Sequence, residues 1–374
     1  MGRIYTRGVI RCSPSSQVAP RDGEGRTAGL MAARAIWVWL VLLLLQSEAA
    51  AQTLGHLAAD QSPDRFARLE AGARREGELR LYTSLAPEDV AAIAAAFEKK
   101  HGVRIQAWRA SSENILQRII TESRSGRGEF DVVETIGPEL ERLSREKLLQ
   151  AVYSARHEEL IAQAVPAHRE WASTRLNVFT QAYNTALVRR EDLPKRYEDL
   201  LDPKWKGKLG MEADDALWFG ALATGLGESA TLQVFRDIAR SNGLSVRKGH
   251  SLLTNLVVAG EVPLALTVYN YRAEQLKRKG APIEWFSIGE AIALPSGLGI
   301  ARRAPHPHSA LLFYEFMLSD GQQLLASRDF APTSKVIDSP LSRGPIRLVN
   351  PGLALDRIDQ WGKLYDEIVV KQSR

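Results

Sequence analysis

The feature of this sequence that most restricts its fold is a regular alternation of strand patterns and helix patterns. Residues 78–83, 103–108 and 130–133 have the short apolar or alternating character of β-strands, and helical spacing of apolar side chains follows each of them. Pro87 and Pro138 begin two of these helix patterns, at a position where the missing N–H is tolerated. The order βαβαβα is typical of a parallel sheet covered by helices, and it predicts an α/β fold.

A second series of strand and helix patterns follows a longer strand pattern at residues 177–183. This series consists of strands at 209–211 and 262–268, helices at 216–225, 252–259, 308–318 and 321–327, and a crossing segment rich in Gly and Pro at 282–299. We expect Ser111 or Ser112 to cap the helix after the second strand, and Ser319 to cap the helix at 321–327. Two α/β halves in a chain of 374 residues predict two lobes.

The two predicted lobes are each built from separate parts of the chain. Lobe I is expected to contain residues 77–178 and 290–335, and lobe II residues 179–289 and 336–374. In open parallel sheets, ligands bind beyond the carboxyl ends of the strands, where helix N-termini point. Two such lobes facing each other would form a cleft that can close on a solute.

An uncharged apolar run at residues 36–45 lies near the N-terminus. It is shorter than the roughly 20 residues that span a bilayer. A basic segment with Arg34 precedes it and small residues up to Ala51 follow it, which is the three-part pattern of a cleaved secretory signal peptide. We therefore expect an upstream extension at 1–30, a signal peptide at 31–51 and a periplasmic mature protein. The alternative is an uncleaved membrane anchor or a buried helix.

Removal of residues 1–51 changes the composition of the chain. These residues carry six of the 49 Lys and Arg side chains and three of the 44 Asp and Glu side chains, so the formal net charge falls from +5 to +2. Cys12, the only cysteine, is lost with them, so the mature chain needs no disulfide and has no lipid-attachment cysteine. A nearly neutral chain argues against nucleic acid as a partner. We expect no stable membrane insertion after cleavage of the signal peptide.

The sequence contains no recognisable catalytic motif. Neither a G-x-S-x-G turn nor an H-E-x-x-H pair is present, and His101, His306 and His308 are interpreted as loop or capping residues. Residues 225–230 match G-x-G-x-x-A formally, but they follow a helix pattern where a dinucleotide site requires a strand. We expect no catalysis, and a secreted enzyme on the same fold is the alternative from a different functional class.

Polar side chains follow the predicted strands of both halves, where a ligand would bind. Hydroxyl groups and helix N-termini suit anions, whereas carboxylates and phenolates suit a cation. The alternative for each of these residues is a helix cap or a solvated loop position. Arg109, Glu113 and Thr135 also follow strands. The residues that we expect in the ligand site are Thr83, Ser84, Ser111, Ser112, Glu134, Glu212, Asp214, Asp215, Trp218, Tyr269 and Tyr271.

Several stretches resemble the extracellular solute-binding proteins of ABC importers, in the branch usually called ferric-iron binding. The resemblance is carried by residues 81–84, 108–113, 130–134, 260–265 and 304–322, and most distinctively by Tyr-Glu-Asp-Leu-Leu-Asp-Pro-Lys-Trp-Lys-Gly at 197–207. It covers nearly all of the mature chain. It implies the type II periplasmic-binding fold, in which two α/β lobes with a ligand cleft are joined by crossing hinge strands. It also implies delivery of the solute to an ABC permease in the inner membrane, by a protein that we expect to be a monomer.

The resemblance implies Fe³⁺ as a candidate transported ligand, with Tyr269 and Tyr271 as metal ligands. Ferric binders of this family present two adjacent tyrosines after the corresponding strand of the second lobe, and their phenolates bind Fe³⁺. Here Asn270 separates the two tyrosines, the first loop has no histidine, and the acidic residue of the third loop, Glu134, is offset from the family pattern. A small organic solute without metal, such as an amine, a carboxylate or a phosphorylated compound, is therefore the alternative ligand.

Overall fold

The computed structural model describes residues 54–126, 128–340 and 344–373. The upstream extension predicted at residues 1–30 and the signal peptide predicted at 31–51 lie outside this part of the chain. None of the helices in the described part combines the length and the apolar character that crossing a membrane would require.

The first half of the described chain alternates strands and helices in the predicted order. Its elements are α2 (Arg65–Glu76), β1 (Glu78–Thr83), α3 (Pro87–His101), β2 (Arg104–Arg109), α4 (Ser112–Arg124), β3 (Val132–Ile136), α5 (Gly137–Arg145) and β4 (Leu149–Gln150). β1 pairs in parallel with both β2 and β3. Pro87 is the first residue of α3, and Gly102 ends this helix with a φ of 73°. The predicted cap is confirmed at Ser111, whose side chain accepts the backbone N–H of Asn114 at the start of α4.

The second half contains a similar series of strands and helices. It begins with β5 (Ala172–Asn184), β6 (Leu209–Glu212), α6 (Ala216–Leu226), α7 (Glu228–Ser241), β7 (Ser245–Arg247), α8 (His250–Ala259), β8 (Leu264–Tyr269), α9 (Asn270–Arg278), β9 (Ile283–Phe286) and β10 (Ala291–Ala301). It ends with α10 (Pro307–Leu318), α11 (Asp320–Ser327), β11 (Ala331–Pro332), β12 (Ile346–Leu348) and α12 (Pro351–Tyr365). β6 pairs in parallel with both β7 and β8.

The strands of the described residues belong to one sheet, with the main order β2-β1-β3-β10-β5-β8-β6-β7. The long strands β5 and β10 lie in the middle, antiparallel to each other; β10 is also antiparallel to β3, and β5 to β8. Residues 282–299, which the sequence predicts to cross between the halves, contain β9 and most of β10. Gly297 lets β10 approach β5 closely, because a Cβ at this position would lie 1.9 Å from the carbonyl oxygen of Ala172.

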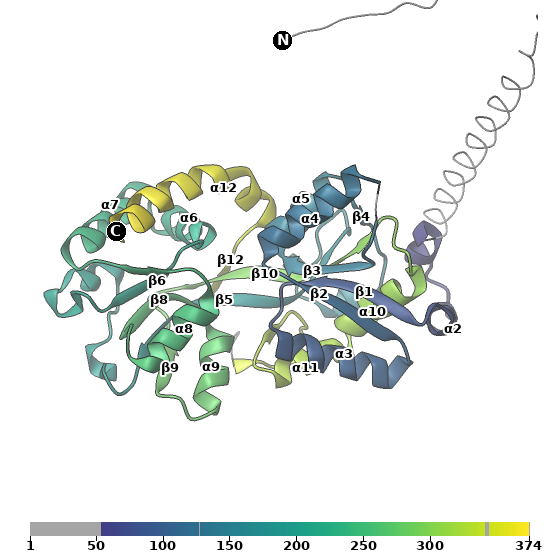
Figure 1. Ribbon diagram of the computed structural model, residues 1–374, viewed down its shortest axis with the longest axis horizontal. Coiled ribbons are helices and arrows are strands. Elements are labelled where there is room, and N and C mark those ends of the chain that lie inside the picture. The colour runs from purple at the N-terminus through teal and green to yellow at the C-terminus, as the bar shows by residue number, and fades with distance from the viewer. Residues whose placement is uncertain (1–53, 127, 341–343, 374) are drawn as a thin grey trace, which may run out of the picture. The chain divides into compact units, whose positions relative to one another are not determined.

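Two large groups of buried apolar side chains fill the molecule. The first core draws its side chains from residues 54–172 and 298–330, and the second core draws them from residues 179–294 and 349–369. In Figure 1, α4 and α5 cover one side of β1 and β3, while α6, α7 and α12 cover one side of β6 and β8. Helices α3, α8 and α9 lie on the opposite sides of these strands.

One capping prediction is wrong. Ser319 does not cap α11 with its side chain; its hydroxyl donates to the carbonyl oxygen of Glu315 at 2.7 Å, in the last turn of α10. The carbonyl groups at the end of a helix lack partners within that helix, so a hydroxyl at this boundary can bond backward as readily as forward.

Candidate functional site

The carboxyl ends of the parallel strands in the two halves point toward each other across β5. β3 ends at Ile136, which lies opposite Ser296 of β10, and Ser296 lies opposite Arg175 of β5. β8 ends at Tyr269, which lies opposite Phe179 of β5. Measured along β5, the two strand ends are therefore separated by the segment from Arg175 to Phe179. The carboxyl ends of the strands, where the sequence predicts the ligand site, therefore meet over this segment.

On the side of the first core, the carboxylate of Glu134 is held by three groups. The Thr83 hydroxyl donates to its Oε2 at 2.6 Å, and the backbone N–H of Ser84 donates to the same oxygen at 3.3 Å. The Arg175 guanidinium forms an ion pair with Oε1. The structure thus brings the predicted residues Thr83, Ser84 and Glu134 together. It also shows that Arg175 neutralises the carboxylate that a cation would need on this side.

Sequence reasoning missed Arg175, which lies on the crossing strand and is 3% exposed. Its Nε has no hydrogen-bond partner among the described residues, and the same holds for Oδ1 of Asn177 and Oγ of Ser296. Side chains two apart on a strand share a face, so Arg175 and Asn177 point the same way. Arginine is rarely buried without a partner, so a charged residue beside an apolar strand pattern is the signal that could have identified it.

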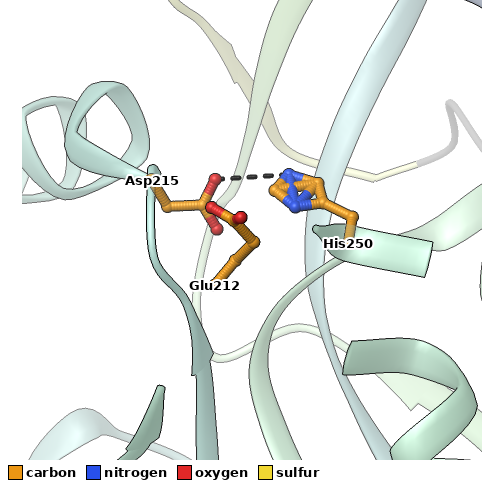
Figure 2. A group of neighbouring side chains, drawn as sticks. All are labelled: Glu212, Asp215 and His250. Carbon is orange, nitrogen blue, oxygen red and sulfur yellow. Dashed lines mark ion pairs between the residues drawn. The ribbon is translucent and has the colours of Figure 1, made fainter. Parts of the chain in front are cut away.

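On the side of the second core, three ionisable side chains converge (Figure 2). Glu212 is the last residue of β6, Asp215 directly precedes α6, and His250 is the first residue of α8. One ligand atom from each of the three lies within 4.8 Å of the others. Asp215 Oδ1 and His250 Nε2 are 3.2 Å apart. The structure therefore brings the predicted Glu212 and Asp215 together and adds His250.

The two carboxylates of this cluster have different surroundings. Glu212 accepts the backbone N–H of Gly249 at 2.7 Å on Oε1 and the backbone N–H of Asp214 on Oε2. Asp215 is 4% exposed, and its Oδ2 has no hydrogen-bond partner in the described part of the chain. Glu212 is therefore fixed by the backbone, whereas Asp215 presents a buried oxygen that lacks a donor.

Burial shifts the protonation of the whole cluster. It raises the pKa of Glu212, although the N–H groups of Gly249 and Asp214 oppose this shift. Burial raises the pKa of Asp215 well above its usual range, and the nearby Glu212 carboxylate adds to the effect. Burial lowers the pKa of His250 to about 4, so its imidazole is neutral at pH 7. A neutral imidazole beside carboxyl groups is a ligand set that metal cations use.

The two tyrosines lie side by side at the junction of β8 and α9. Tyr269 ends the strand and Tyr271 lies in the first turn of the helix, with ring centroids 5.7 Å apart and planes 14° apart. Tyr269 contacts His250 at a centroid distance of 4.0 Å, and Tyr271 contacts Phe330 at 4.4 Å. Burial raises the pKa of Tyr271 to about 12 and that of Tyr269 well above its usual range. Both phenols are therefore protonated at neutral pH.

The prediction that Trp218 lines the ligand site is wrong. Its side chain is 1% exposed and lies in the second core, with ring centroids 6.2 Å from Tyr197 and 5.9 Å from Phe235. A tryptophan in the first turn after a strand can face the ligand or the core. Here the apolar face of α6 turns it inward, which the sequence pattern did not distinguish.

Three further predicted residues lie apart from these groups. The Ser111 side chain is occupied as the cap of α4, and Ser112 is the first residue of that helix. Asp214 is exposed and forms an ion pair with Lys248 at 3.2 Å.

His250 was not among the predicted residues. Its position as the first residue of a helix that follows a short strand is the signal that could have found it.

The sequence of this chain is similar to those of known proteins. The family model for bacterial extracellular solute-binding proteins matches residues 79–330. The chain is 24% identical over 292 residues to the iron uptake protein A1 of Synechocystis sp., a match that covers 72% of this chain and 79% of that protein.

Solved structures share the fold. Iron-bound HitA from Pseudomonas aeruginosa superposes with a TM-score of 0.69 at 22% identity, covering 78% of this chain and 99% of that one. AfuA from Actinobacillus pleuropneumoniae with bound fructose-6-phosphate also gives a TM-score of 0.69, at 19% identity, covering 79% of this chain and 99% of that one. These similarities confirm the predicted α/β fold of the periplasmic binding proteins.

Proposed function

The chain belongs to the family of bacterial extracellular solute-binding proteins, and from this premise we propose that it is the periplasmic solute-binding component of an ABC importer. It captures its cargo in the region between the two cores and delivers it to an ABC permease in the inner membrane. The cargo is a metal ion, with iron as the first candidate, because one relative is named iron uptake protein A1 and HitA was solved with iron bound. The protein performs no catalysis.

The cargo proposal rests on the buried oxygen of Asp215 that lacks a donor. Leaving a carboxylate oxygen buried and unpaired is costly unless the protein is arranged for a partner. The neutral imidazole of His250 lies 3.2 Å from the same carboxylate, and the phenol of Tyr269 packs against that imidazole. Nitrogen and oxygen donors from three elements at the carboxyl ends of the strands suit a cation better than an apolar solute.

The capture mechanism follows from the two cores and the two strands that cross between them. We assign residues 77–178 and 290–335 to lobe I and residues 179–289 and 336–374 to lobe II. We add α2 to lobe I, because its side chains Leu69 and Ala73 pack in the first core. β5 and β10 act as the hinge, and closure of the lobes encloses the cargo. The mature protein acts as a monomer after removal of the signal peptide.

A phosphorylated or carboxylated organic solute is the second candidate cargo. Arg175 favours it, because a buried guanidinium with a free Nε is a donor for an anionic group. Oδ1 of Asn177 and Oγ of Ser296, both buried without a partner among the described residues, could bond the hydroxyl groups of such a solute. AfuA, which has the same fold, was solved with fructose-6-phosphate bound.

The decisive experiment identifies what the protein carries when it is made in its native compartment. The mature protein is purified from periplasm, and its bound contents are measured by native mass spectrometry and elemental analysis. We expect about one metal ion per chain in the wild type and much less in Asp215→Asn. The matched control is Asp359→Asn, a change at an exposed carboxylate of α12, which should retain the metal.

Two outcomes would contradict parts of this proposal. An organic compound bound without metal would overturn the metal cargo and support the second candidate. Failure of any metal or co-purified compound to raise the melting temperature, together with no change in the radius of gyration by X-ray scattering, would overturn the solute-binding function. Conversion of a bound solute into product would show that the protein is an enzyme.

A further inference from the structure

We infer that Glu212, Asp215 and His250 form the metal site and that this site takes a divalent transition-metal cation of the Zn²⁺, Mn²⁺ or Fe²⁺ class. This inference rests on the proposed function and goes beyond it, because it assigns the ligands and the charge of the ion. It also differs from the expectation that Tyr269 and Tyr271 are the metal ligands.

The geometry of the three side chains is the first argument. They come from three different elements, the end of β6, the residue before α6 and the start of α8, yet their ligand atoms lie within 4.8 Å of one another. In Figure 2 the two carboxylates and the imidazole point into the same space. Ligand atoms around a transition metal lie about 2.0–2.2 Å from the ion. Small side-chain movements of the three groups would bring them to that distance.

The partners of each side chain are the second argument. Asp215 is 4% exposed, and its Oδ2 has no partner in the described part of the chain. Both oxygens of Glu212 accept backbone N–H groups, but a carboxylate oxygen has a second lone pair that can still bind a cation. The same N–H bonds hold Glu212 in a fixed orientation, as the groups surrounding metal ligands commonly do.

The charge of the donor set decides the class of ion. Carboxylates lose their protons when they bind a metal, so in the bound state the two carboxylates and the imidazole would carry two negative charges, which a divalent cation balances. A net charge in a buried site is unfavourable, so a trivalent ion would require a further anionic ligand. Glu134, the carboxylate at the opposite strand ends, is already paired with Arg175. Imidazole with carboxylate oxygens is a donor set typical of Zn²⁺ and Fe²⁺.

Glu212 also has a structural role, which the inference must accommodate. Its carboxylate joins the loop before α6 to the turn at Gly249, and its carbonyl oxygen accepts the hydroxyl of Tyr365. A purely structural role would explain why Glu212 is buried and hydrogen-bonded. It would not explain why Asp215 and His250 are placed against it with a carboxylate oxygen left without a donor.

The test measures the affinity of the metal-free mature protein for Zn²⁺, for Mn²⁺, for Fe²⁺ without oxygen and for ferric citrate, by isothermal titration calorimetry. We expect one divalent ion to bind per chain. Asp215→Asn and His250→Gln should each weaken this binding by at least about tenfold. The matched controls are Asp359→Asn and His56→Gln, which change exposed residues of the same types and should leave the affinity unchanged. Unchanged affinity in both site variants would overturn the inference.

A measurement on the wild type covers the case in which a site variant fails to fold. X-ray absorption of the Zn²⁺-loaded protein should show one nitrogen ligand at about 2.0–2.1 Å together with carboxylate oxygens. A shell made only of oxygen ligands would overturn the assignment of His250.

The inference and the proposed function can fail separately. If ferric iron alone binds, with a phenolate absorption band that Tyr269→Phe removes and His250→Gln leaves unchanged, this inference is wrong and the proposed function stands. If no metal binds and an organic solute stabilises the protein, the inference and the metal cargo are both wrong, and only the importer function remains.

Discussion

Arg175 and Glu134 form an ion pair in which the two side chains are only 4% and 3% exposed. The pair joins the crossing strand β5 to β3, and the Thr83 hydroxyl donates to the other oxygen of the carboxylate. A charge buried to this degree is strongly destabilising unless an opposite charge is paired with it, so each side chain depends on the other for its stabilisation. The pair also fixes the position of the Arg175 Nε, which has no hydrogen-bond partner among the described residues.

We predict that Arg175→Met lowers the free energy of unfolding by about 3–5 kcal/mol, because it leaves the Glu134 carboxylate buried without its counter-charge. Urea denaturation of the two proteins measures the difference. The double variant Arg175→Met/Glu134→Gln should recover much of the loss, since neither charge remains. A loss below about 1 kcal/mol in the single variant would show that solvent reaches Glu134.

We predict that Gly297→Ala destabilises the fold by about 1–3 kcal/mol or more, because the new Cβ would lie 1.9 Å from the carbonyl oxygen of Ala172. β10 would have to move away from its antiparallel neighbour β5 where Gly297 lies opposite Ser173. The matched control is Gly362→Ala in α12, where a Cβ meets nothing within 4 Å. This control should stabilise the protein by about 0.5–1 kcal/mol. Equal melting temperatures for the two variants would contradict the prediction.

We predict that His157 makes the protein less stable as the pH falls below about 6.5. Burial, with smaller contributions from Arg169 and Arg65, lowers the pKa of His157 from its ordinary value of 6.5 to about 4. Between these two values the unfolded chain binds a proton at this side chain while the folded protein does not, so acid favours unfolding. Unfolding free energies at pH 7 and pH 5 measure this loss. It should be smaller in His157→Gln, and an equal loss in both proteins would contradict the prediction.

We predict that Tyr365→Phe weakens divalent metal binding while most of the stability is kept. The Tyr365 ring packs in the second core, 5.5 Å from the ring of Phe219, and its hydroxyl donates to the carbonyl oxygen of Glu212. Phenylalanine retains the ring contact and loses the hydrogen bond, so the free energy of unfolding should fall by about 0.5–1.5 kcal/mol. Calorimetric titration should show a lower metal affinity. An unchanged affinity would mean that the position of Glu212 does not depend on this bond.

The fold could be predicted largely from local patterns. Strand and helix spacing identified β1, β6 and β8 close to their observed ends, because these elements have clear apolar periodicity and Gly or Pro boundaries. The predictions that failed concerned side chains with two favourable orientations. Ser319 bonds backward into α10, and Trp218 turns into the core, and neither outcome is visible in the residues beside it.

The site could be predicted only in part. Thr83, Glu134, Glu212 and Asp215 were placed in the candidate site because the carboxyl ends of parallel strands bring polar residues into one region. Arg175 and His250 were missed because their importance depends on contacts between residues far apart in the sequence. The stacking of Tyr269 on Tyr271 depends on the change from strand to helix at Asn270, a boundary that spacing alone does not fix.

The division of each core between distant segments has a consequence for synthesis. The first core needs side chains from residues 298–330 as well as from residues 54–172, so it cannot be completed until most of the chain has left the ribosome. Contacts of such long sequence separation form slowly. A chain whose first core forms this late stays unfolded during much of its synthesis. A protein must be unfolded to pass through a narrow export channel.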